Sequence, residues 1–91
     1  MARRTLIISI EAQKQYLEFK NTQPRLAKKI DSLIASIYLD PEKGIGKPEQ
    51  LKHAYAGYWS RRISARDRLI YSFTASEIVI IKLKDHYQSH S

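Results

Sequence analysis

Residues 47–71 combine basic and aromatic side chains with a carboxylate, Glu49, near the start of the stretch. The basic members are Lys47, Lys52, Arg61, Arg62, Arg66 and Arg68. The aromatic members are Tyr55, Tyr58, Trp59 and Tyr71. Cations bind phosphates and aromatic rings stack on bases, so this mixture is typical of a surface that holds RNA. The carboxylate beside it raises the question of chemistry on that RNA.

Cleavage of RNA without a metal requires a base for the ribose 2′-hydroxyl, cations for the phosphorane and an acid for the departing 5′-oxygen. The sequence offers one candidate set: Glu49, the Arg/Lys group and His86. The alternatives are a solvated loop glutamate and an exposed tail histidine. With no cysteine and only three scattered histidines, the sequence predicts neither a metal site nor a cofactor.

Arginine suits a phosphate because its planar fork donates two parallel hydrogen bonds to two oxygens. Arg68, at the start of a predicted strand, is one such candidate. Arg61 and Arg62 are neighbours on another predicted strand, so only one of them can face the substrate, and the sequence does not tell which. Lys47 and Lys52 are candidates for positioning phosphates and could equally be plain surface lysines, and Lys82 and Lys84 are further candidates for RNA contact.

Composition predicts a single soluble domain over residues 1–91. Hydrophobic residues make up 43%, which is ordinary, whereas a net charge of +7 and a pI near 9.8 are high for so short a chain. Such a charge favours a polyanionic partner, the alternative being a solvated basic surface without one. No apolar run is long enough for a signal peptide or a membrane span, so we expect a cytoplasmic protein without a membrane partner.

The first half of the chain reads as a strand followed by two helices. Residues 5–9 form a β-branched run, and Ser9 can cap the helix that follows it. Residues 21–24 end this helix and begin another, since proline is tolerated in a first helical turn. The second helix carries an apolar stripe of Leu26, Ile30, Leu33, Ile34, Ile37 and Tyr38. It ends before Pro41, where a loop rich in glycine and proline begins.

After this loop the hydrophobic period changes to two, which predicts strands at residues 50–53, 58–64, 68–74 and 78–84. Short connections favour an antiparallel meander, and the apolar run 78–81 predicts a central last strand. If that strand is regular, Lys82, Lys84 and His86 share one face. The predicted fold is therefore α+β, with both helices on one face of a twisted, mainly antiparallel sheet and the other face available as the functional surface.

Four segments of the sequence resemble the RelE superfamily of bacterial toxins: residues 47–53, 57–63, 68–71 and 86–87. Within it they most resemble the YoeB/Txe branch, whose members are ribosome-dependent mRNA endonucleases neutralised by a YefM-type antitoxin. The resemblance runs from about residue 8 to residue 87 and implies a RelE-like, microbial-RNase-type fold.

The resemblance also implies roles for individual residues. The family's general base corresponds to Glu49, its transition-state arginine to Arg68 and its general acid to His86. Tyr87 corresponds to the tyrosine that stacks or lies on the leaving-group side. The chain departs from the family at Asp85, where relatives commonly carry an aromatic or small residue. An acid there could repel phosphate or raise the pKa of His86 further.

The function implied is that of a toxin of a type II toxin–antitoxin system, cutting mRNA in the ribosomal A site by metal-independent 2′-hydroxyl attack. The implied partners are a YefM/Phd-type antitoxin, the ribosome and mRNA, and operator DNA only as the toxin–antitoxin complex. Whether the chain forms a homodimer stays open. The alternatives are a non-catalytic RNA-binding module and a RelE/ParE-fold toxin that acts on DNA gyrase by protein contact.

Overall fold

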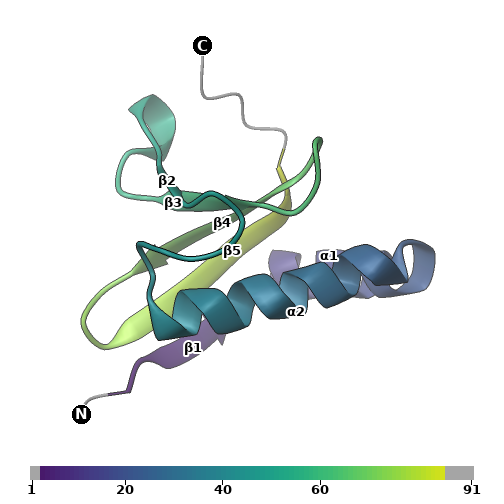
Figure 1. Ribbon diagram of the computed structural model, residues 1–91, viewed down its shortest axis with the longest axis horizontal. Helices are drawn as coiled ribbons and strands as arrows, with labels where there is room; N and C mark the ends of the chain where they lie inside the picture. Colours follow the sequence, from purple (N-terminus) through teal and green to yellow (C-terminus); the bar gives the residue numbers. More distant parts are fainter. Residues whose placement is uncertain (1–2, 86–91) are drawn as a thin grey trace.

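The elements follow the order that the hydrophobic patterns predict. A computed structural model describes residues 3–85. Its elements are β1 (Thr5–Ile8), α1 (Ile10–Thr22), α2 (Pro24–Leu39), β2 (Glu49–Gln50), the 3-10 helix η1 (His53–Tyr55), β3 (Trp59–Arg62), β4 (Arg68–Phe73) and β5 (Glu77–Asp85). Figure 1 shows both helices on one side of the sheet.

The first helix begins where Ser9 can satisfy its free backbone donors. The Ser9 Oγ accepts a hydrogen bond from the Ala12 amide at 3.0 Å and donates one to the Ile81 carbonyl at 2.7 Å. The same hydroxyl therefore caps α1 and ties the cap to β5. Pro24 opens α2, whose buried face consists of Ala27, Ile30, Leu33 and Ile37.

The sheet has five strands in the order β1-β5-β4-β3-β2. The first strand pairs with β5 in parallel, and the other pairs are antiparallel. Since β5 lies between β1 and β4, the predicted central position of the last strand is confirmed. The α+β fold with two helices on one face of a mainly antiparallel sheet is confirmed as well.

The core lies between the helices and the facing side of the sheet. Its largest apolar side chains include Phe19, Ile30, Leu33, Ile37, Leu69, Tyr71, Ile78 and Ile80. In β4, Leu69 and Tyr71 belong to this core, so Arg68 and Ile70 point to the opposite side of the sheet. We call that side, which the helices do not cover, the open face.

Two predicted strands differ from those observed. The strand expected at residues 50–53 is shorter, because the chain turns into η1 at His53, whose φ is +58°. Strand β5 is irregular: Tyr71 pairs with Ile80, but the preceding Ile70 pairs with Lys82, and Arg68 pairs with Asp85. Each shift adds one unpaired residue to β5 and changes the side on which the next side chains lie.

Candidate active site

The register of the sheet places the predicted site residues in two adjacent rows on the open face. The first row runs across β2, β3, β4 and β5 through Glu49, Ser60, Ile70 and Lys82. The second row, nearer the turn between β3 and β4, consists of Arg62, Arg68 and Asp85. Glu49, on the two-residue edge strand β2, thus shares this face with Arg62, Arg68 and Lys82.

The Glu49 carboxylate and the Arg68 guanidinium lie next to each other on this face. The distance from Glu49 Oε1 to Arg68 Nη1 is 3.8 Å, and their side chains are 38% and 15% exposed. At this distance the two charges attract without a close hydrogen bond. A carboxylate and a guanidinium side by side are the kinds of group, a base and a cation for a phosphate, that acid–base cleavage of RNA requires.

Arg61, which was predicted as an RNA contact, is fully buried. All five of its donors are used, because its guanidinium bonds Tyr71 Oη (3.1 Å), Ser36 Oγ (2.8 Å) and the carbonyls of Ile45 (2.9 Å), Asp40 (2.8 Å) and Lys43 (3.1 Å). The prediction is wrong for this residue. Arg61 instead organises the loop that leads to Glu49.

Two further contacts close this loop over the Arg61 guanidinium. Tyr71 Oη donates to the Pro41 carbonyl at 2.6 Å, and the Arg62 amide donates to the Gly46 carbonyl at 2.7 Å. A Cβ on Gly46 would lie 2.5 Å from Leu33 Cδ2, so a larger residue would require the loop or Leu33 to shift. The loop is therefore held at both ends before the chain enters β2.

Arg62 is exposed in the second row, so of the two neighbouring arginines it is Arg62 that lies on the open face. Lys47 and Lys52 are exposed on either side of Glu49 in the chain, and Lys82 lies half-buried in the first row. Their predicted contacts with RNA remain predictions.

Lys84 does not belong to this surface. Its Nζ lies 2.9 Å from Glu18 Oε1 and 5.3 Å from the centre of the Phe19 ring, both on α1. The expectation that Lys82 and Lys84 share one face is wrong, because the irregularities in β5 turn Lys84 toward the helices. The predicted RNA contact of Lys84 on the open face is wrong for the same reason.

His86 and Tyr87 lie outside the described residues, so the roles expected of them remain predictions. The residue before them, Asp85, is the last of β5 and stands in the second row opposite Arg68.

Sequence reasoning missed the partner of Tyr55. Tyr55 Oη donates to Asp85 Oδ2 at 2.6 Å, joining η1 to the end of β5. This bond, with smaller contributions from burial and nearby carboxylates, raises the pKa of Tyr55 to about 12. No sequence signal could have found it, because the two residues are 30 positions apart and meet only through the register of the sheet.

Two further features of the described part of the chain bear on its chemistry. Among residues 3–85, no group of three His, Cys, Asp or Glu side chains is placed to hold a metal ion. Neither helix within that range has the length and apolar character needed to cross a membrane.

A family model, a related sequence and solved structures all identify similar proteins of one kind. Residues 8–87 match the family described as the YoeB-like toxin of bacterial type II toxin–antitoxin systems. The chain is 47% identical to the toxin YoeB of Synechocystis sp. over 73 residues, which cover 80% of this chain and 85% of that protein.

Two solved structures from Staphylococcus aureus are also similar. The YoeB dimer superposes with a TM-score of 0.85 at 39% identity, over 94% of this chain and 100% of that one. The toxin in the heterotetrameric YoeB–YefM complex superposes with a TM-score of 0.81 at the same identity and coverage. The chain therefore belongs to the YoeB-like toxins of bacterial type II toxin–antitoxin systems.

Proposed function

We propose that this toxin is a ribosome-dependent endoribonuclease that cuts mRNA in the A site without a metal. The observation that carries the proposal is the pairing of Glu49 Oε1 with Arg68 Nη1 at 3.8 Å on the open face. A carboxylate and a guanidinium this close can engage the 2′-hydroxyl and the adjacent phosphate of one nucleotide together.

In the proposed reaction, Glu49 removes the proton from the ribose 2′-hydroxyl, whose oxygen then forms a bond to phosphorus. Arg68 stabilises the phosphorane, because its donors and charge face the oxygens on which negative charge develops. The bond from phosphorus to the 5′-oxygen breaks, and His86 protonates that oxygen. The products are a 2′,3′-cyclic phosphate and a 5′-hydroxyl.

Other cations would position the RNA around this centre. Arg62 stands directly opposite Arg68 on β3, and Lys82 follows on β5 in the neighbouring row. Lys47 and Lys52, which flank Glu49, would bind the phosphates at the sheet edge, and Tyr87 would stack on the leaving-group side. These contacts supply affinity, and the bond-breaking step belongs to Glu49, Arg68 and His86.

We further propose a YefM/Phd-type antitoxin as the inhibitory partner in the cytoplasm. A relative from Staphylococcus aureus forms a heterotetramer with YefM, and the same toxin is also known as a dimer. The present chain would bind operator DNA only within the toxin–antitoxin complex, and its free form would be a homodimer.

The test of the enzymatic proposal is primer extension on ribosomes programmed with a defined message. We expect a cut in the A-site codon for the parent and for a control, Lys84→Gln, whose side chain lies on the helix side. Glu49→Gln and Arg68→Ala should lose most of the activity, by about 100-fold or more.

A message with a single 2′-deoxy residue at the cleaved position distinguishes the nucleophile. The cut should stop while ribosome binding persists, and chelator followed by restored magnesium should leave the parent reaction unchanged. Cutting of the deoxy message with a 5′-phosphate product would mean that water attacks, and the proposed mechanism would be abandoned. An intact message combined with inhibition of gyrase would favour the alternative of a toxin that acts by protein contact.

A further inference from the structure

Asp85 and Arg68 stand directly opposite each other on the open face, at the ends of β5 and β4. Opposite charges in such cross-strand pairs usually attract and form an ion pair. An ion pair here would occupy the fork of the arginine proposed to hold the phosphate. It would also bring a second negative charge to the place where the phosphorane must form.

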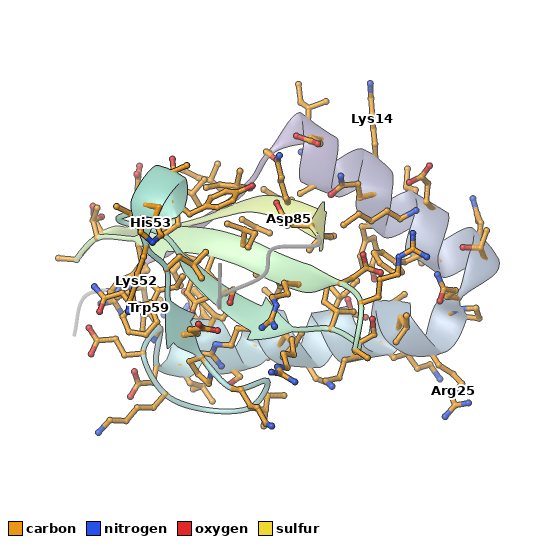
Figure 2. The ribbon with its side chains drawn as sticks, turned by 90° about the horizontal axis from the view of Figure 1, so that it is seen from above. Lys14, Arg25, Lys52, His53, Trp59 and Asp85 are labelled. Atoms are coloured by element: carbon orange, nitrogen blue, oxygen red, sulfur yellow. The ribbon has the colours of Figure 1, made fainter. Side chains whose placement is uncertain are left out.

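The expected ion pair is not made between these two described residues. Within residues 3–85, the ion-pair partner of Arg68 is Glu49, at 3.8 Å, and Asp85 directs its Oδ2 to Tyr55 Oη at 2.6 Å. Figure 2 shows Asp85 at the end of β5 and His53 on η1, the short helix that also carries Tyr55. The Asp85 Oδ2 atom is thus bonded to a hydroxyl from η1, while Arg68 pairs with Glu49.

We propose that Tyr55 is a positioning residue that holds the Asp85 carboxylate away from Arg68, leaving the guanidinium to Glu49 and the scissile phosphate. This inference rests on the proposed function, since it assigns Tyr55 a role in the same site. It also gives a reason why an acid is tolerated beside a phosphate-binding centre. The Asp85 Oδ2 atom accepts its hydrogen bond from the neutral Tyr55 hydroxyl instead.

Two observations make Tyr55 suited to this role. Its pKa, raised to about 12, keeps the hydroxyl protonated and able to donate throughout the neutral range. Its ring packs edge-on against Tyr58, with the centroids 6.3 Å apart, so the hydroxyl is presented from a fixed direction. Replacement by phenylalanine keeps this ring contact and removes only the donor.

The test compares four proteins in single-turnover cleavage on programmed ribosomes: the parent, Tyr55→Phe, Asp85→Asn and the double variant. Tyr55→Phe should lower the rate of the chemical step about 10-fold or more, with little change in the concentration needed for half-maximal rate. Asp85→Asn should cut at least as well as the parent. The double variant should cut at the same rate as Asp85→Asn. Without the Asp85 charge, loss of the Tyr55 hydroxyl can no longer affect Arg68.

A second measurement reports on Arg68 without any turnover. In NMR spectra of the free proteins, the Arg68 side-chain N–H signal should shift in Tyr55→Phe and return toward the parent position in the double variant. Urea unfolding of all four proteins identifies any loss that comes from stability alone.

Two outcomes would overturn the inference while the proposed function stands: a Tyr55→Phe variant as active as the parent, or a double variant as impaired as Tyr55→Phe. The second would mean that Tyr55 acts by itself and not through Asp85. A parent protein that does not cut at all would instead overturn the proposed function, and the inference with it.

Discussion

Neighbouring arginines with the same chemistry lie in opposite environments in this toxin. Arg61 is fully buried and gives its five donors to hydroxyl and carbonyl oxygens, whereas Arg62 is exposed beside Arg68. A buried cation is tolerated only while every donor has a partner, because an unpaired charge in the interior is costly. Arg61 is therefore a structural residue whose contacts cannot be made by another side chain.

Replacement by lysine should lower the free energy of unfolding much more at Arg61 than at Arg62. Lysine has three donors, so Arg61→Lys would leave at least two acceptors unpaired, at about 1–3 kcal/mol each. We expect a loss of about 2–5 kcal/mol in the free energy of unfolding. The matched change Arg62→Lys, on the surface, should stay within about 0.5 kcal/mol of the parent. Urea unfolding measures both, and equal losses would contradict the structural role of Arg61.

Ionisation of Tyr55 should destabilise the folded protein in alkali. Its pKa is raised from 10.0 to about 12, chiefly by the bond to Asp85. Because the folded chain holds this proton more tightly than the unfolded chain, the stabilisation is complete below pH 10 and is lost as pH rises through about 12. The pKa values of Tyr16 and Tyr71 are raised as well, so a comparison is needed to isolate Tyr55.

The comparison is between the parent and Tyr55→Phe, unfolded in urea at a series of pH values. The difference in unfolding free energy between them should shrink as pH rises from 10 to about 12. A difference that stays constant over this range would mean that the Tyr55–Asp85 bond does not contribute to stability.

The sequence predicts the alternation of residues 59–62 but not the burial of Arg61. Because side chains on a strand alternate, Arg61 and Arg62 were expected on opposite faces, as observed. Arginine is rarely buried, however, and most of the acceptors of Arg61 are backbone carbonyls of a loop with no hydrophobic pattern. The carboxylate and arginine at positions 49 and 68 were placed by the family resemblance, which composition and periodicity alone could not have supplied.

At the level of elements, the loop between α2 and β2 determines where Glu49 lies. It wraps around Arg61, bonds α2 through Ser36 and bonds β3 through the carbonyl of Gly46. The composition of residues 41–48 predicts a loop but not this shape, because its hydrogen bonds come from distant elements. Glu49 is therefore positioned by the core as much as by its own strand of two residues.

Two glycines allow the contribution of this loop to be measured. Gly46 and Gly57 both have positive φ, at +83° and +93°. A Cβ on Gly46 would lie 2.5 Å from Leu33 Cδ2, whereas a Cβ on Gly57 would meet no neighbouring atom within 4 Å. Both alanine variants should lose about 1 kcal/mol through backbone strain. Gly46→Ala should lose about 1–3 kcal/mol more through overpacking, measured by thermal or urea unfolding.

Activity should follow the same order in this pair. Displacement of the loop moves Glu49, so the rate of cleavage at saturating ribosomes should fall further in Gly46→Ala than its remaining folded fraction explains. Equal stability and activity in both variants would mean that the loop adapts without consequence for the site.

Strand β5 shows where periodicity alone fails. The run of residues 78–81 contains no glycine or turn residue that could mark a bulge, yet the pairing with β4 shifts after Ile80 and again before Asp85. These shifts direct Lys84 to Glu18 on α1 and bring Asp85 to the row of Arg68. A regular strand would have sent Lys82 and Lys84 to the same side, which is what the sequence pattern indicated.

At the scale of the whole molecule, the net charge of +7 is distributed over both sides of the sheet. The open face carries Arg62, Arg68 and Lys82, while the helices carry basic residues such as Lys14 and Arg25, which Figure 2 shows far from η1. Only cations that reach the RNA release counterions when it binds. If RNA binds the open face, the slope of affinity against salt should therefore depend on the basic residues of that face and not on the others.

This dependence gives a prediction that separates the two faces. In the background of Glu49→Gln, which prevents cutting, binding of a short single-stranded RNA should weaken steeply between about 50 and 200 mM salt, with a log–log slope of about −0.7 per phosphate contact. Arg62→Gln should make the slope shallower by about 0.7, because it removes one contact of the open face. Lys84→Gln removes the same charge but should leave the slope unchanged, since its Nζ lies 2.9 Å from Glu18. Fluorescence anisotropy measures all three proteins, and equal changes in both variants would mean that net charge alone, and not the open face, binds the RNA.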